Sequence, residues 1–134
     1  MLGDSNLSDV LVVLVVEDDP LIQTIIDEAL RDGGYEPAIV ASGEEAVKLL
    51  QANQHYRALV SDINLKGTLD GWDVARQARE IDPSFPIVYM TGAAAEQWPS
   101  HGVPNSILLG KPFAPAQLVT AISQLLNAGG QPAS

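Results

Sequence analysis

The segment Arg57-Ala58-Leu59-Val60-Ser61-Asp62 decides the fold of this chain. Its centre, Ala58 to Val60, is apolar without alternation, which is typical of a strand covered on both faces in a parallel sheet. The segment ends on an acid, and the residues that follow, Ile63-Asn64-Leu65-Lys66-Gly67, favour a turn. We therefore expect the Asp62 carboxylate at the carboxyl end of a buried strand, where open α/β sheets bind their ligands.

Length and composition predict one globular domain over residues 10–127, with flexible tails at residues 1–9 and 128–134. The chain has 134 residues, of which 46% are hydrophobic, enough for one core and too few for a second domain. Seven basic against 17 acidic residues give a formal charge of -10, which argues against binding to DNA or to anionic lipid. The absence of cysteine excludes disulfides and thiolate metal sites. The first apolar run, Val10 to Val16, is too short to span a membrane, so we expect a cytoplasmic protein without membrane insertion.

Apolar strands and amphipathic helices alternate along the chain, which predicts a doubly wound α/β domain. Val10 to Val16 is continuously apolar and rich in valine, as in a central strand. Asp19 and Pro20 then suit the N-cap and the first turn of a helix that ends at Gly33. The other expected elements are a strand Pro37 to Val40, a helix opened by Ser42 and ending near Gln51, the strand ending at Asp62, a helix Gly71 to Ile81, a strand Pro86 to Thr91, a short helix broken at Pro99, a strand Ser106 to Leu109, and a last helix through Leu126.

Polar side chains stand where the expected strands end. Glu17 and Asp18 follow the first strand, Asp62 ends the third, Thr91 ends the fourth and Lys111 follows the fifth. Because the carboxyl ends of parallel strands share one edge of a sheet, we expect these side chains to form one site. Converging carboxylates repel one another unless a cation compensates, and oxygen ligands with open positions suit Mg²⁺. A carboxylate facing that ion can attack phosphorus, while a lysine ammonium and a threonine hydroxyl hold the phosphoryl oxygens.

In this order, the residues resemble the receiver domain of two-component response regulators. The resemblance covers Val10 to Leu126 and rests on Glu17-Asp18, Asp62, Thr91-Gly92 and Lys111-Pro112-Phe113. It implies a bacterial signalling domain with a flavodoxin-like fold, in which five helices surround a five-stranded parallel sheet of strand order 2-1-3-4-5. With no output module after Leu126, the chain looks like a stand-alone receiver.

The resemblance also implies a role for each acid. Asp62 would be the phosphoacceptor, taking a phosphoryl group from a sensor histidine kinase or a histidine phosphotransfer protein. Asp18 and Asp62 would bind Mg²⁺, or Mn²⁺, directly and together with the backbone carbonyl of Asn64. Glu17 would act on the ion through water.

By the same resemblance, Thr91 and Lys111 would contact the phosphoryl group, beside the small Gly92. The peptide between Lys111 and Pro112 would be cis. Asn64 and Ala93 would flank the path of attacking water and set the lifetime of the phosphoryl group.

One position departs from the family pattern and keeps an alternative open. Many receivers carry an aromatic ring three residues before the lysine, which moves inward on phosphorylation, and this chain has Leu108 there. A degenerate receiver, a scaffold that binds a partner regardless of phosphate, is therefore one alternative. A hydrolase of the haloacid-dehalogenase type is less consistent, because its second acid would stand where the chain has Asn64. We expect a phosphoacceptor that signals by protein interaction and catalyses only its own phosphorylation and dephosphorylation.

Overall fold

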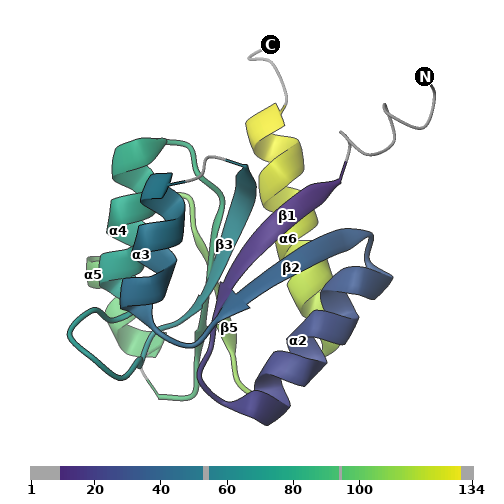
Figure 1. Cartoon of the computed structure of the whole chain (residues 1–134), viewed down its shortest axis with the longest axis horizontal. Helices are drawn as coiled ribbons and strands as arrows, with labels where there is room; N and C mark the ends of the chain where they lie inside the picture. The colour runs from purple at the N-terminus through teal and green to yellow at the C-terminus, as the bar shows by residue number, and fades with distance from the viewer. Residues whose placement is uncertain (1–9, 53–54, 94, 131–134) are drawn as a thin grey trace.

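The computed structural model describes residues 10–52, 55–93 and 95–130, so the predicted tail at residues 1–9 lies outside it (Figure 1). Strands and helices alternate throughout these residues. The strands are β1 (Leu11–Val16), β2 (Tyr35–Val40), β3 (Tyr56–Asp62), β4 (Ile87–Thr91) and β5 (Ile107–Gly110). The helices are α2 (Pro20–Asp32), α3 (Gly43–Ala52), α4 (Gly71–Ile81), α5 (Trp98–His101) and α6 (Pro115–Gly130), with a 3-10 turn, η1 (Ala95–Gln97), before α5.

The five strands form one parallel sheet in the order β2-β1-β3-β4-β5, which confirms the predicted fold. In the middle of the sheet, β1 pairs with β3, and Val16 lies opposite Ser61. Asp62 in turn lies opposite Met90 of β4. Because all the strands are parallel, their carboxyl ends reach the same edge, as the sequence predicted.

Alternate residues of the central strands are buried on opposite faces of the sheet, in two separate hydrophobic clusters. Leu14 and Val16 face a cluster built with α3 and α4, whereas Val13 and Val15 face a cluster built with α2 and α6. Figure 1 shows these two pairs of helices on opposite faces of the sheet. A strand covered on both faces has no polar side, which is why the strands read as continuous apolar runs.

The ends of α2 lie where the sequence placed them. The Asp19 side chain caps the helix by accepting a hydrogen bond from the Leu21 amide at 2.9 Å, and Pro20 occupies the first turn. The helix ends at Asp32, and the Gly33 amide donates to the Ala29 carbonyl at 3.0 Å. Local capping chemistry therefore decided both ends of this helix.

Several strand boundaries differ from the prediction. β1 begins at Leu11 rather than Val10, and β4 begins at Ile87 rather than Pro86. β2 begins at Tyr35 rather than Pro37, because Tyr35 already pairs with Leu11 of β1. β5 is shifted by one residue, since its last residue, Gly110, pairs with Thr91 of β4. Pairing with a neighbouring strand therefore set the start of β2 and the end of β5.

The two last helices also differ from the prediction. Pro99 does not break the short helix but lies in the first turn of α5, where a proline is tolerated because its missing N–H has no partner there anyway. α6 continues to Gly130, so residues 128–130 belong to the helix rather than to the predicted tail, and residues 131–134 lie outside the described part. None of the helices in the described ranges combines the length and apolar character needed to cross a bilayer.

Candidate functional site

Three carboxylates converge at the carboxyl edge of the sheet. Glu17 and Asp18 directly follow β1, and Asp62 is the last residue of β3. Because these strands are neighbours in the sheet, one oxygen from each of the three side chains lies within 4.8 Å of the others. Glu17 and Asp62 are buried, while Asp18 is half-buried. The predicted acidic cluster is therefore present.

Lys111 directly follows β5, the edge strand of the sheet, and its side chain extends to the same cluster. Its Nζ donates to Glu17 Oε1 at 2.8 Å and to Asp62 Oδ2 at 3.2 Å. Its own amide donates to the Thr91 carbonyl at 2.7 Å, which holds the backbone against the end of β4. The Lys111–Pro112 peptide is cis, as expected from the family resemblance. One ammonium thus joins the ends of β1 and β3 from a position just after β5.

Burial and pairing change the acid–base properties of this cluster. Burial raises the pKa of Glu17 above its ordinary value, and the nearby Asp62 charge adds to this, although the hydrogen bond from Lys111 works against it. Burial by itself would lower the pKa of Lys111, but the hydrogen bond to Glu17 and the charge of Asp62 outweigh it, so this pKa lies above its ordinary value. At neutral pH, Lys111 is therefore a fixed positive charge.

Thr91 lies at the same edge of the sheet, and its side chain is hydrogen-bonded to the loop that follows β4. Its side chain is buried at the end of β4, one residue beyond Met90, which pairs with Asp62. The Thr91 hydroxyl accepts a hydrogen bond from the Ala93 amide at 3.1 Å. Gly92 and Ala93 are exposed beside it. The hydroxyl thus lies where the sequence predicted, and it also orders the backbone that follows β4.

The turn after Asp62 is packed unusually close to α4. Asn64 is exposed in this turn, and its carbonyl accepts no hydrogen bond from the described residues. The first residue of α4, Gly71, donates its amide to the Ile63 carbonyl at 2.9 Å. A Cβ at Gly71 would lie 2.3 Å from the Asp62 carbonyl oxygen, so only glycine fits there. Sequence reasoning missed this role of Gly71, because a glycine at the start of a helix has no distinctive local pattern.

The aromatic group near Leu108 comes from the neighbouring strand. Leu108 is half-buried and pairs with Tyr89 of β4. Tyr89 is fully buried, its hydroxyl accepts a hydrogen bond from the Val103 amide at 3.1 Å, and its ring centroid lies 4.7 Å from that of Trp72. Leu108 therefore packs beside an aromatic ring that is already held by two contacts. The sequence interpretation considered only position 108 and did not assign Tyr89.

The donor set of the acidic cluster fits a hard divalent cation. All three side chains offer carboxylate oxygens, and Asn64, two residues after Asp62, has a backbone carbonyl that would offer another oxygen. Oxygen-only sites with several acids favour Mg²⁺ or Mn²⁺ over softer metals. The residues predicted as metal ligands are therefore consistent with such an ion.

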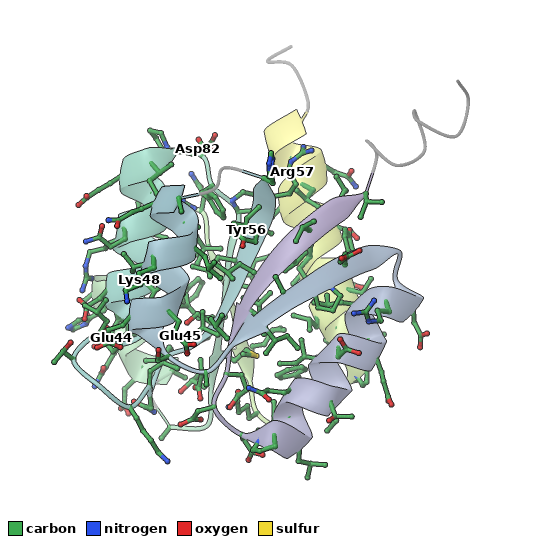
Figure 2. All side chains as sticks on the ribbon, in the orientation of Figure 1. Glu44, Glu45, Lys48, Tyr56, Arg57 and Asp82 are labelled. Atoms are coloured by element: carbon green, nitrogen blue, oxygen red, sulfur yellow. The ribbon has the colours of Figure 1, made fainter. Side chains whose placement is uncertain are left out.

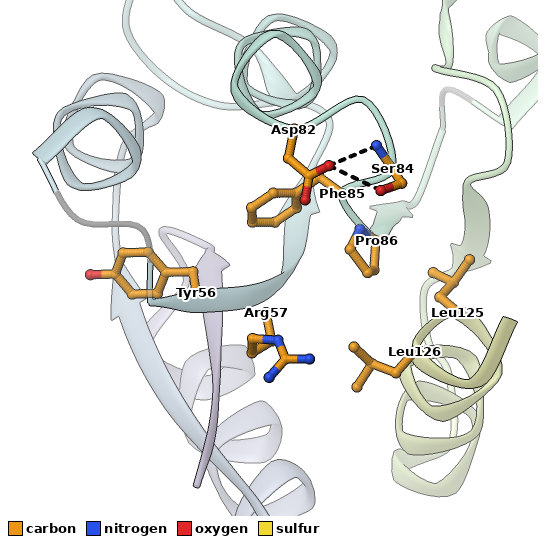
Figure 3. A pocket seen from close by; sticks show the side chains of 8 residues that line it. All are labelled: Tyr56, Arg57, Asp82, Ser84, Phe85, Pro86, Leu125 and Leu126. Carbon is orange, nitrogen blue, oxygen red and sulfur yellow. Dashed lines mark hydrogen bonds between the residues drawn. The ribbon is translucent and has the colours of Figure 1, made fainter. Parts of the chain in front are cut away.

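A hollow of about 170 Å³ lies at the opposite end of β3 from this cluster (Figure 3). Arg57 points toward it, and the Asp82 carboxylate on another wall accepts hydrogen bonds from the Ser84 amide and hydroxyl, both at 3.0 Å. Arg57 is the second residue of β3 and Asp62 the last, so the length of the strand separates this hollow from the carboxylates. It is not part of the candidate site.

A second hollow, of about 260 Å³, borders the candidate site itself. It is mostly apolar, and its walls are Ile22 and Ile25 of α2 together with Lys111, Pro112 and Phe113. Leu21, on the same helix, is 70% exposed. Apolar groups that reach the surface beside a polar site are typical of protein contact regions.

Comparison with known proteins identifies the family of this arrangement. A family model for the response regulator receiver domain matches residues 13–123. The chain is 34% identical over 118 residues to the response regulator receiver protein CpdR of Brucella abortus, a match that covers 87% of this chain and 97% of that protein. It is 32% identical to the transcriptional regulatory protein PrrA of Mycobacterium tuberculosis, but spans only about half of that relative, 52%.

Solved structures agree with the sequence matches. A response regulator receiver protein from Sinorhizobium medicae has a TM-score of 0.87 and 45% identity, over 90% of this chain and 97% of that one. The receiver domain of a sensor histidine kinase from Pseudomonas aeruginosa, solved with a magnesium ion in its active site cleft, has a TM-score of 0.76 and 30% identity, over 88% and 98%. Since the family model covers most of the chain and its relatives share both sequence and fold, the chain belongs to the response regulator receiver family.

Proposed function

We propose that this receiver carries a signal by accepting a phosphoryl group on Asp62 from a phosphohistidine, on a sensor histidine kinase or a histidine phosphotransfer protein. One observation carries the proposal: the Lys111 ammonium contacts both Glu17 and Asp62, so it links the residue that ends β3 and the residue that follows β1 from a position just after β5. A carboxylate held beside a fixed cation is suited to accept a phosphoryl group, because the cation can bind the phosphoryl oxygens and offset the added charge, about -1.5 to -2 at neutral pH.

In the proposed reaction, Asp62 supplies the nucleophile and the imidazole of the donor is the leaving group. An oxygen of Asp62 attacks the phosphorus in line with the P–N bond of the donor; that bond breaks, and the imidazole leaves with its electron pair and is protonated. Lys111 shifts from pairing with Asp62 to pairing with a phosphoryl oxygen. The Thr91 hydroxyl supports another phosphoryl oxygen. In the phosphorylated product, Thr91 at the end of β4 and Lys111 after β5 would thus each contact a phosphoryl oxygen.

Mg²⁺ is the proposed cofactor, with Mn²⁺ as a substitute. Asp18, Asp62 and the Asn64 carbonyl would hold it, with Glu17 acting through water. When bound, the ion would neutralise charge on the phosphoryl oxygens. The magnesium ion in the Pseudomonas aeruginosa receiver domain supports the same cofactor here.

The phosphorylated protein is proposed to act by binding a downstream protein. The apolar hollow beside Lys111 supports a protein as phosphodonor. Asn64 stands where a phosphohydrolase would need a second acid, so turnover of external phosphoesters is not proposed. A cytoplasmic location stays a prediction from the sequence.

Mass spectrometry after incubation with acetyl phosphate and Mg²⁺ tests the proposal. We expect one added phosphoryl group in the wild type and none in Asp62→Asn. Asp19→Asn is the matched control, because it removes an acid next to the cluster and asparagine caps a helix as well as aspartate does. Label that persists in Asp62→Asn, or its absence from the wild type with several donors, would favour the phosphate-independent scaffold instead.

A further inference from the structure

The segment between β3 and α4, residues 63–70, is fastened to a helix that contributes nothing to the acidic cluster. Glu44, in the first turn of α3, accepts two hydrogen bonds from Thr68 through Oε2, from its amide at 2.8 Å and from its hydroxyl at 2.6 Å. These residues are 24 positions apart in sequence. We call this pair of hydrogen bonds the Glu44–Thr68 clip.

The two hydrogen bonds of the clip are charge-assisted, because their acceptor is a carboxylate. The Thr68 hydroxyl and then the Thr68 amide lower the pKa of Glu44 to about 2, so the carboxylate stays charged far below neutral pH. Gly67 has a φ of +102, and a Cβ there would lie 2.9 Å from Glu44 Oε1. The backbone conformation favours glycine at this position, and a larger residue would displace the Glu44 carboxylate.

A backbone hydrogen bond also joins the two ends of this segment. The Gly71 amide donates to the Ile63 carbonyl at 2.9 Å, directly after Asp62. Near the clip, the backbone of Gly43 approaches Leu69 so closely that a Cβ on Gly43 would lie 2.9 Å from the Leu69 carbonyl oxygen. Asn64, whose carbonyl is a proposed metal ligand, lies in sequence between Ile63, which accepts the Gly71 hydrogen bond, and Thr68 of the clip. Its position is therefore set by contacts at both ends of the segment.

We propose that Glu44 is a positioning residue for the cation site: by holding Thr68, it limits the movement of the segment that contains Asn64, whose carbonyl is a proposed metal ligand. The inference rests on the proposed function, because it assumes that the cluster binds Mg²⁺. A ligand that is held in place before binding loses less conformational entropy when the ion arrives. The first turn of α3 is thereby coupled to cation affinity, although none of its side chains touches the ion.

The chain offers a matched control in the same helical turn. Glu45, labelled beside Glu44 on α3 in Figure 2, accepts hydrogen bonds from the Ser42 hydroxyl at 3.1 Å and the Ala41 amide at 3.3 Å. It makes no hydrogen bond to residues 63–70. Glu45→Gln therefore removes the same charge from the same turn without breaking the clip.

Mg²⁺ titration by isothermal calorimetry tests the inference on the full chain. We expect Glu44→Ala and Thr68→Val each to raise the Mg²⁺ dissociation constant by roughly threefold to tenfold, the change for losing one ordinary hydrogen bond, because both bonds of the clip are exposed to solvent. Thr68→Ser keeps the hydroxyl and should restore wild-type affinity, and Glu45→Gln should stay within about twofold of it. Amide hydrogen exchange without Mg²⁺ should be faster at residues 63–70 in the two disrupted variants, while exchange in the β1 and β3 amides is unchanged.

The outcomes separate this inference from the proposed function. Wild-type protein that binds no Mg²⁺ would overturn both. Wild-type binding with equal dissociation constants in Glu44→Ala and Thr68→Val would overturn the inference alone. Equal weakening by Glu45→Gln would also overturn it, because it would show that only the net charge matters.

Discussion

Replacing Lys111 by methionine is the most direct test of the electrostatics of this site. The substitution keeps the length of the side chain but removes the cation that lies between Glu17 and Asp62. Two buried carboxylates would then face each other without compensation. We therefore expect Lys111→Met to destabilise the protein when no divalent cation is present.

The size of the effect follows from the exposure of the groups. The side chains of Glu17 and Asp62 are 1% and 10% exposed, and that of Lys111 is 20% exposed. Removing one partner of a fully buried ion pair costs about 3–5 kcal/mol, and the partial exposure of Lys111 reduces this to about 2–3 kcal/mol. For a domain of this size, that loss corresponds to a fall in melting temperature of roughly 6–12 °C.

Urea denaturation with and without Mg²⁺ measures this loss. We expect Mg²⁺ to recover most of it, because the ion replaces the missing positive charge. We also expect the loss to shrink as the pH falls through the raised pKa of Glu17, because a protonated Glu17 no longer repels Asp62. Lys48→Met is the control, since Lys48 is exposed on α3. A Lys111→Met variant as stable as the wild type at neutral pH without Mg²⁺ would refute the reasoning, as would a failure of Glu17→Gln to restore stability in the Lys111→Met background.

Three further predictions concern the same edge of the sheet. Burial raises the pKa of Glu17 above its ordinary 4.5, so its stabilising contribution is fully present below pH 4.5 and is lost as the pH rises through the folded-state pKa. Glu17→Gln should therefore be more stable than the wild type at neutral pH in urea denaturation, and a difference that does not change with pH would contradict this. Asp18→Asn should relieve repulsion, raising the melting temperature without Mg²⁺ by roughly 2–4 °C while weakening Mg²⁺ binding in calorimetry, and a lower melting temperature would count against the clustered acids. Gly71→Ala should cost about 2–4 kcal/mol in urea denaturation, because its Cβ would meet the Asp62 carbonyl oxygen at 2.3 Å. Gly110→Ala, where a Cβ meets nothing within 4 Å, is its control, and similar losses in both variants would rule out the close approach as the cause.

The sequence predicted the fold well because the informative signals are local. A valine-rich run reads as a strand buried on both faces, and the Asp19-Pro20 pair reads as a helix start, without knowledge of the rest of the chain. Some strand boundaries were predicted wrongly, among them those at Tyr35 and Gly110. These two depend on which residue of the neighbouring strand each residue pairs with. Such pairing is a property of the assembled sheet.

The candidate site divides in the same way. That acids, a threonine and a lysine would meet could be predicted, because parallel strands bring their carboxyl ends to one edge. That Lys111 would contact both Glu17 and Asp62 could not, since it depends on the reach of one side chain across three strands. The Glu44–Thr68 clip was also missed, because nothing in the sequence around either residue marks a contact between them.

By itself, the sequence determined the order of strands and helices and the chemistry available at the strand ends, because hydrophobic patterning and capping act within a few residues of each position. Tertiary packing sets which acids lie close together, which glycine lies against Asp62, and which helix holds the segment beyond it. These features depend on distances of a few ångströms between residues far apart in the chain, and such distances are set by packing.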